Sequence, residues 1–243
     1  MKRPHHDFMH RAASLLWCAV LAAASPLSIG AAPGKPGSPD SLAGIWQSIP
    51  DGKVLPGGMK NSGSPSEIVT LPGATKPVKG EAGQQDPYKL CQAVGAFRMM
   101  ALPDIRMEFV PAPGRLVMLF EDISHGHMRS LYTDRSTHPA DYQPRYAFQG
   151  DSIAHWEGST LVVDTTGFNQ RTWLNDSTIA SDALHLVERI RPLPDGRHLE
   201  YRMTATDSKS LAKPYSYVRY FQRSDAPIED DSCHIENSWT PGP

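Results

Sequence analysis

Hydrophobic and polar residues alternate along a series of short segments between residues 105 and 223. A period of two is typical of β-strands that bury one face. Proline and glycine at 111–114, 157–159 and 194–196 mark hairpin turns between some of these segments. Because no long amphipathic helix interrupts them, the segments predict an all-β domain whose antiparallel sheet closes into a barrel rather than a sandwich. Strands are expected over 42–47, 106–111, 115–121, 127–133, 152–156, 160–165, 184–191, 198–206 and 215–223.

The chain begins with a pattern typical of a secretory signal peptide. Basic residues precede an apolar run over 12–24, and small residues as far as Ala32 offer cleavage positions. The run is shorter than the about 20 apolar residues that a membrane span needs, and no later segment is longer. The sequence therefore predicts a signal peptide over 1–32 and a periplasmic or secreted protein without a membrane span.

The remainder of the chain, 33–243, has the length of a single domain. Its first part, 40–90, is rich in glycine, proline and serine, which predicts long loops. Residues 91–243 hold almost all of the predicted strands and are expected to form the barrel core. The formal net charge of the full chain is −2, and this charge balance gives no reason to expect nucleic acid or an anionic membrane as a partner. A small molecule is the expected partner, and the oligomeric state stays open.

The chain has three cysteines, and Cys18 lies within the predicted signal peptide. In an oxidising compartment the other two, Cys91 and Cys233, are expected to form a disulfide. A cross-link over so long a loop stabilises a fold by up to roughly 5 kcal/mol on the chain-entropy model. Two free thiols, or a metal site that uses both cysteines, are the alternatives.

Several segments in the second half of the chain form a combination that is specific, although each alone is common. They are Tyr132-Thr-Asp134 with His138-Pro139, Trp156-Glu-Gly158, Thr160-Leu-Val-Val-Asp-Thr165 with Gly167-Phe-Asn169, Thr172-Trp-Leu174 and Ala183-Leu-His-Leu-Val-Glu-Arg189. Together they resemble a family of secreted bacterial proteins with a lipocalin-like, calycin-type β-barrel domain. Gly44-x-Trp46 is similar to the pattern that lipocalins carry on their first strand. The resemblance runs from about residue 95 onward and implies a shared barrel domain and little about its chemistry.

Histidines gather in one part of the chain, at His125, His127, His138 and His155. On a strand, His125 and His127 point to the same face, as two metal ligands or two walls of a pocket would. The His-x-His of cupins is followed by a glutamate, whereas residues 128–133 contain none. A turn with solvated histidines is therefore the alternative to a metal site, and we predict no metal or other cofactor.

Arg129 shares a face of its predicted strand with His127 and Leu131. An arginine beside histidines in the mouth of a barrel can stabilise a carboxylate, enolate or phenolate by charge-assisted hydrogen bonds. The alternative for Arg129 is a surface ion pair with Glu121 on the neighbouring strand.

Glu188 shares one face of its strand with Leu184 and Leu186, whereas His185 and Arg189 lie on the other. One of the two faces is internal, and either could present polar groups to a ligand. Burial would raise the pKa of the Glu188 carboxyl and suit it to acid–base catalysis. A structural salt bridge between Glu188 and an arginine of the adjacent strand, such as Arg202, is the alternative.

Asp164 ends a strand core of leucine and valine and precedes a turn. It is expected either to cap that turn or to orient a histidine at the rim of the barrel. Aromatic residues are candidates for the walls of a ligand pocket or, alternatively, for the core. They are Tyr132, Trp156, Phe168 and Trp173.

The sequence lacks G-x-S-x-G, P-loop, dinucleotide-binding, H-E-x-x-H and C-x-x-C-H motifs. We therefore expect a cofactor-independent isomerase, lyase or hydratase that transfers protons on a small, partly apolar substrate. His127, His138 or His185 would move the proton, Glu188 or Asp164 would orient the imidazole, and Arg129 or Arg189 would stabilise the oxyanion, while Tyr132, Trp156 and Trp173 would contact the substrate. A periplasmic carrier of an apolar or aromatic ligand is the first alternative. A metal-dependent enzyme with His125 and His127 as ligands is the second.

Overall fold

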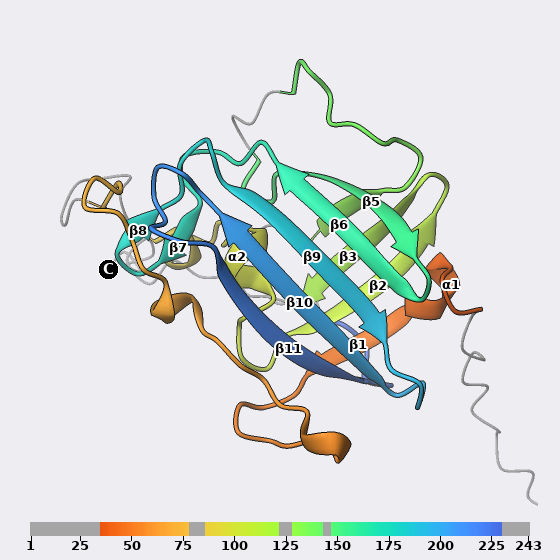
Figure 1. The fold of residues 1–243 in the computed structure, drawn as a ribbon. Helices are drawn as coiled ribbons and strands as arrows, with labels where there is room; N and C mark the ends of the chain where they lie inside the picture. Colours follow the sequence, from red (N-terminus) through yellow and green to blue (C-terminus); the bar gives the residue numbers. More distant parts are fainter. Residues whose placement is uncertain (1–34, 78–85, 122–127, 143–146, 230–243) are drawn as a thin grey trace, which may run out of the picture. The chain divides into compact units, whose positions relative to one another are not determined.

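Nine strands close into a barrel in the structure, a computed structural model that describes residues 35–77, 86–121, 128–142 and 147–229 (Figure 1). Around the barrel they follow the order β1-β11-β10-β9-β6-β5-β4-β3-β2. Their bounds are β1 (Gly44–Ser48), β2 (Arg106–Ala112), β3 (Arg115–Glu121), β4 (Met128–Tyr132), β5 (Asp151–Glu157), β6 (Thr160–Thr166), β9 (His185–Pro192), β10 (His198–Thr206) and β11 (Tyr215–Arg223). The predicted all-β, lipocalin-like barrel is confirmed, with one strand more than the eight of lipocalins.

Each strand predicted from the alternation is present, and its ends agree with the prediction within about two residues. The alternation of hydrophobic and polar residues does not predict the shorter elements, because each is too short to show a hydrophobic period. They are the two-stranded ribbon of β7 (Trp173–Asn175) and β8 (Thr178–Ile179), the helices α1 (Pro39–Leu42) and α2 (Ala96–Met99), and the 3-10 turns η1 (Pro56–Gly58), η2 (Pro65–Glu67) and η3 (Pro87–Leu90).

One pair of neighbouring strands departs from the predicted antiparallel sheet. β4 and β5 are parallel, with Leu131 opposite Ser152 and Tyr132 opposite Ile153. Parallel neighbours need a connection of a dozen or more residues that returns to the starting end of the sheet. The connection over 133–150 is long enough to do so.

The core lies inside the barrel and includes the buried residues of α2. Phe97 and Met99 of α2 are at most 1% exposed, and Tyr217 of β11 donates a hydrogen bond to the Phe97 carbonyl oxygen at 2.9 Å. Near α1, the fully buried Trp46 of β1 donates from its indole N–H to the Leu42 carbonyl oxygen at 2.8 Å. The Arg223 guanidinium stacks on the Trp46 ring, 4.3 Å from its centroid.

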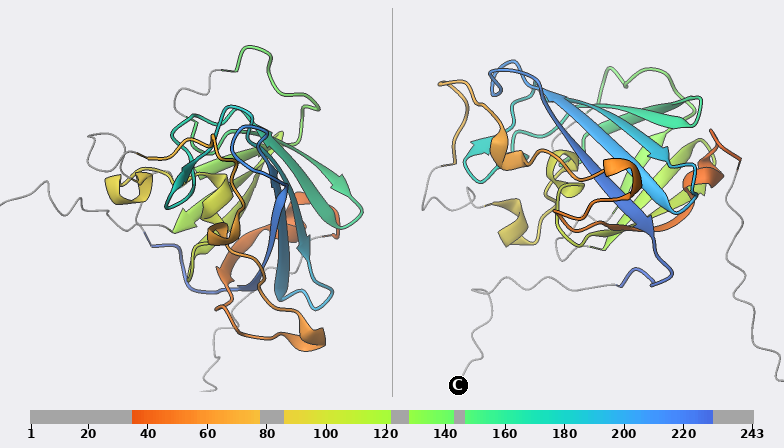
Figure 2. Two further views of the ribbon diagram at one scale, coloured as in Figure 1. Left: turned by 60° about the vertical axis from the view of Figure 1, so that its left-hand side comes forward. Right: turned by 60° about the horizontal axis from the view of Figure 1, so that its bottom comes forward.

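The predicted N-terminal loops extend the sheet beyond the short strand β1. Ser62 pairs with Val218 of β11 through two backbone hydrogen bonds, and Thr70 forms a bridge with Leu211. The segment 49–77 therefore runs along the barrel, as Figure 2 shows, rather than as a separate linker. The backbone of β11 beyond β1 finds its hydrogen bonds there.

The predicted signal peptide over 1–32 lies outside the described residues, and so does Cys233. The Cys91–Cys233 disulfide therefore stays a prediction. Among the described residues, no helix combines the length and the apolar character needed to cross a membrane. The disulfide is tested by the intact mass of non-reduced protein, which is expected to be lower than that of the reduced chain by the mass of two hydrogens. Equal masses before and after reduction would contradict it.

Candidate functional site

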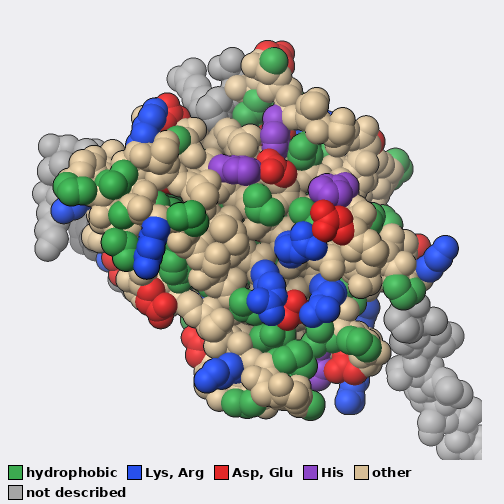
Figure 3. All heavy atoms as spheres, in the orientation of Figure 1, with side chains coloured by type: hydrophobic (Ala, Val, Ile, Leu, Met, Phe, Trp, Pro, Cys, Tyr) green, Lys and Arg blue, Asp and Glu red, His purple; other side chains and the backbone are tan. Residues whose placement is uncertain are grey.

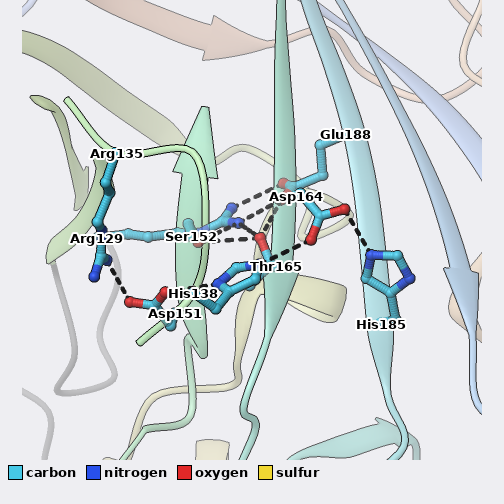
Figure 4. Close-up of polar contacts among 9 residues, drawn as sticks. All are labelled: Arg129, Arg135, His138, Asp151, Ser152, Asp164, Thr165, His185 and Glu188. Atoms are coloured by element: carbon cyan, nitrogen blue, oxygen red, sulfur yellow. Dashed lines mark hydrogen bonds and ion pairs between the residues drawn. The ribbon is translucent and has the colours of Figure 1, made fainter. Parts of the chain in front are cut away.

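Five polar residues meet on the outer face of the barrel, over β5, β6 and β9 (Figure 4). Asp151, Asp164 and His185 point outward because their strand neighbours Ser152, Thr165 and Leu186 point into the barrel. The crossover connection between β4 and β5 adds Arg135 and His138. We call these five residues the outer His–Asp network: Arg135, His138, Asp151, Asp164 and His185.

The crossover connection is held against the barrel near the end of β6. The ring of Tyr142 lies on Gly167, where a Cβ atom would come within 2.5 Å of the Tyr142 ring. Gly167 also has φ +69°, a conformation that favours glycine. This close approach places His138 over the outward carboxylates of β5 and β6.

His138 bridges the two carboxylates of the network. Its Nδ1 lies 2.7 Å from Asp151 Oδ2, and its Nε2 lies 2.9 Å from Asp164 Oδ1. Both nitrogens therefore face acceptors, and the protonated imidazolium donates to both. Burial lowers the pKa of His138, but the hydrogen bonds to Asp164 and Asp151 outweigh it, and the pKa is raised above its usual value.

Asp164 holds a second histidine on its other oxygen. His185 Nε2 lies 2.8 Å from Asp164 Oδ2. Burial raises the pKa of Asp164, but the hydrogen bonds from His138 and His185 outweigh it, so the pKa is lowered and the carboxylate stays charged. The predicted role of Asp164 as a residue that orients a histidine agrees with these contacts.

The second ring nitrogen of His185 has no hydrogen-bond partner among the described residues, and 39% of the side chain is exposed. When neutral His185 donates from Nε2 to Asp164, the lone pair lies on Nδ1. The carboxylate thus fixes the tautomer and the orientation of the ring. This geometry suits a general base or acid. In Figure 3, histidine and acidic side chains lie side by side on this face of the molecule.

A hollow of about 360 Å³ lies at the Arg135 end of the network, lined among others by Ser136, Ile153 and His155. Arg135 bonds Asp151 Oδ1 through Nη2 at 2.5 Å, and its guanidinium lies 3.8 Å from the centroid of the Tyr132 ring. The Arg135 Nε–H makes no hydrogen bond with any described residue. The hollow therefore adjoins both a cation and an unsatisfied donor.

A separate polar cluster fills the centre of the barrel, on the opposite face of the same strands (Figure 4). Arg129 donates to Glu188 from Nη1, at 2.8 Å to Oε1, and from Nη2 to Oε2. It also donates to Ser152 Oγ at 3.1 Å and to Thr165 Oγ1 at 2.8 Å. Tyr201 donates to Glu188 Oε1 at 2.7 Å. We call these five residues, Arg129, Ser152, Thr165, Glu188 and Tyr201, the inner Arg–Glu cluster.

The inner Arg–Glu cluster is almost wholly removed from solvent. The side chains of Arg129 and Glu188 are 2% and 0% exposed. Burial lowers the pKa of Arg129, but the charge and the hydrogen bonds of Glu188 outweigh it, so the pKa is raised and the guanidinium stays charged. Arg129 and Glu188 point into the barrel, and their printed partners are one another, Ser152, Thr165 and Tyr201, so among the described residues they do not meet a histidine of the outer network. A buried ion pair with satisfied donors and acceptors is a structural element.

The sequence left two ion pairs open as alternatives, Arg129 with Glu121 and Glu188 with Arg202, and neither pair forms. Glu121 pairs with Arg106 at 2.9 Å, not with Arg129. Arg202 pairs with Glu200 at 3.0 Å, not with Glu188. Glu121 and Arg202 point outward on their strands, whereas Arg129 and Glu188 point inward, so the barrel wall separates them.

The four residues predicted to contact a substrate do not line a common pocket. Tyr132 lies on the outside beneath Arg135, and Trp156 packs partly buried against the core. Trp173 is buried in β7, away from the barrel strands. Arg189 pairs with Glu157 at 2.8 Å on the exposed surface. The sequence pattern did not single out Arg135 and Asp151, because only the tertiary structure brings Arg135 and His138 of the crossover connection to Asp151 of β5.

His125 and His127 lie outside the described residues. Among the residues that the structure does describe, no group of three or more histidine, cysteine, aspartate or glutamate side chains is arranged to hold a metal ion. The fold and the site define a lipocalin-like barrel with a histidine–aspartate network on its outer face. Comparison of the chain with models of known protein families found no match, and comparison with curated proteins found none either.

Replacing Asp151 is expected to lower the pKa of His138. The Asp151→Asn variant removes one of the two negative charges that favour the imidazolium. The stabilisation that His138 contributes is fully present below its unfolded-state pKa and is lost as the pH rises through the raised folded-state value. NMR titration of the His138 Cε1–H signal measures the change. Asp195→Asn, which removes the partner of His198 instead, is the control. An unchanged His138 pKa in Asp151→Asn contradicts the bridging role.

Proposed function

We propose that this protein is a secreted enzyme that transfers protons to or from a small substrate with its own side chains, at the outer His–Asp network. Isomerisation, elimination and hydration all include a proton transfer that a positioned imidazole can perform. The proposal includes membership of the secreted bacterial barrel family that the sequence resembles.

The observation that carries the proposal is the contact of Asp164 with two histidines. One oxygen accepts from His138 and the other from His185. His138 thereby fixes the position of the Asp164 carboxylate, and Asp164 in turn orients the ring of His185. Nδ1 of His185 is directed away from Asp164, its only carboxylate partner among the described residues. A base oriented in this way loses little entropy when it meets a substrate proton.

The location of the network bears on the choice between enzyme and carrier. A carrier of apolar ligands needs an apolar cavity inside the barrel. In the described barrel, Arg129, Glu188 and Tyr201 occupy the centre. The hollow beside Arg135 offers a recess on the outer face instead, next to the network. These features favour chemistry on the outer face over carriage in the interior.

Deuterium exchange tests the proposal even though the natural substrate is unidentified. Purified protein is incubated in D₂O with a panel of small carbon acids, such as 2-oxo acids, 3-oxo acids and aromatic ketones, and the C–H signals are followed by NMR. Wild-type protein is expected to accelerate exchange for at least one member of the panel. His185→Gln, which keeps a polar side chain but cannot act as the base, is expected to abolish it.

His198→Gln is the matched control for this experiment. His198 also bonds an aspartate on the surface, with its Nδ1 2.6 Å from Asp195 Oδ2, but it lies on β10 and belongs to neither cluster. Exchange by wild type and His198→Gln alone supports the proposal. Equal exchange by His185→Gln, or exchange with none of the panel, contradicts it.

A further inference from the structure

A second hollow lies near α1, where the β5–β6 turn and the β9–β10 hairpin approach the helix. Its volume is about 450 Å³, within the range of small-molecule sites. Figure 1 shows α1 beside the β5–β6 turn, and a Cβ atom at Gly37 would come within 2.3 Å of the Gly158 carbonyl oxygen. Only glycine permits this approach, which brings the start of the described chain against the turn.

The walls of this hollow are mainly rigid and apolar. Pro36, Pro192, Leu193 and Pro194 contribute to them. Proline walls are held in shape by their rings, so a bound molecule orders few side chains. Such a surface favours a flat or compact apolar body.

Arg223 supplies the charge in this hollow. It donates from Nε to the Gly196 carbonyl oxygen at 3.0 Å, from Nη1 to Ala43 O at 2.8 Å and from Nη2 to Ser41 O at 3.3 Å. These bonds fix the guanidinium above the Trp46 ring. They leave one N–H on each of Nη1 and Nη2 without an acceptor among the described residues.

The charge of Arg223 has no acidic partner among the described residues. By contrast, Arg106, Arg129 and Arg202 each pair with a glutamate. Burial without a counter-charge lowers the pKa of Arg223. A fixed, partly buried cation that has only carbonyl oxygens as partners favours an anion from solution.

We propose that this hollow binds a small organic carboxylate, with the carboxylate on the free N–H groups of Arg223 and an apolar body against the prolines. A carboxylate offers two acceptor oxygens at the spacing of the guanidinium nitrogens. The hollow shares no residue with the outer His–Asp network, so the two sites are tested independently.

Binding of phenylacetate tests this proposal, with phenylacetamide as the uncharged probe of the same shape. Calorimetry on the purified protein gives the two affinities. The carboxylate is expected to bind at least about tenfold more tightly than the amide, because only the carboxylate meets the guanidinium as a charged acceptor.

Ser159→Phe fills the hollow from the β5–β6 turn without removing a hydrogen bond of Arg223 and is expected to abolish binding. Ser177→Phe, at an exposed serine of the β7–β8 turn, is the matched control and is expected to bind as wild type. Arg223→Lys is expected to weaken the binding of phenylacetate and to leave the binding of phenylacetamide unchanged. Equal affinities of the two probes, binding unchanged in Ser159→Phe, or no binding of phenylacetate overturns the proposal.

Discussion

Glu188→Gln is expected to lower the free energy of unfolding by about 3–5 kcal/mol. The substitution keeps the shape of the side chain but leaves the Arg129 charge without its partner at a side chain that is only 2% exposed. Serine and threonine hydroxyls still accept from Arg129, yet they cannot neutralise it. The cost of an uncompensated buried charge therefore dominates the change. Urea denaturation followed by far-UV circular dichroism measures it.

Replacing both Arg129 and Glu188 tests whether the unpaired buried charge causes this loss of stability. In the triple variant Arg129→Met, Glu188→Leu and Tyr201→Phe, the inner Arg–Glu cluster carries no charge, and Ser152 and Thr165 keep their mutual hydrogen bond of 3.0 Å. We expect it to recover most of the stability, because apolar residues of similar volume replace buried ion pairs at little cost.

The exposed pair of Arg189 and Glu157 is the control for this prediction. Glu157→Gln is expected to leave the unfolding curve unchanged, because solvent already screens that pair. If Glu188→Gln unfolds at the wild-type urea concentration, or if the triple variant is as unstable as Glu188→Gln, the buried charge is not the dominant factor.

Asp164→Asn is expected to lower the proton-exchange rate about 100-fold to 10,000-fold, if His185 is the base. The amide cannot hold both histidines as a charged acceptor, so the ring of His185 loses its tautomer and its orientation. Asp164 acts through His185 and is therefore a positioning residue. The loss should appear in kcat, with little change in KM, because the substrate contacts stay in place.

Two comparisons separate this role from a structural one. Thermal unfolding of Asp164→Asn should stay close to that of wild type, since the side chain is 38% exposed. Asp195→Asn removes the other surface aspartate that bonds a histidine and should leave kcat unchanged. A fall in kcat that is matched by loss of the folded protein, or an equal fall in Asp195→Asn, would assign Asp164 a role in stability alone.

The sequence predicted the strands better than the site because the two depend on different ranges of interaction. Each strand shows its period within a few residues, as β3 does over Arg115–Glu121. The alternation also placed Glu188 and His185 on opposite faces of β9, which is confirmed. It did not show which face is internal, because both carry apolar and charged residues.

The partners within the site depend on chain segments far apart in the sequence. Arg129 and Glu188 are separated by 59 positions, and His138 and Asp164 by 26. Their contacts follow from the parallel pairing of β4 with β5 and from the connection that this pairing requires. No local pattern in the sequence shows that one neighbouring pair in an otherwise antiparallel barrel runs parallel.

The sequence by itself determined the strands, the barrel class and the residue types available for chemistry, because these follow from local alternation and turn residues. The tertiary structure decided which side of each strand is buried and which charges meet. It sorted the candidate residues into an inner Arg–Glu cluster and an outer His–Asp network on the two faces of one sheet. The physical reason is that only closure of the barrel determines which face of each strand is buried. A charge on the buried face then needs an opposite charge beside it, whereas a histidine on the outer face stays accessible to solvent.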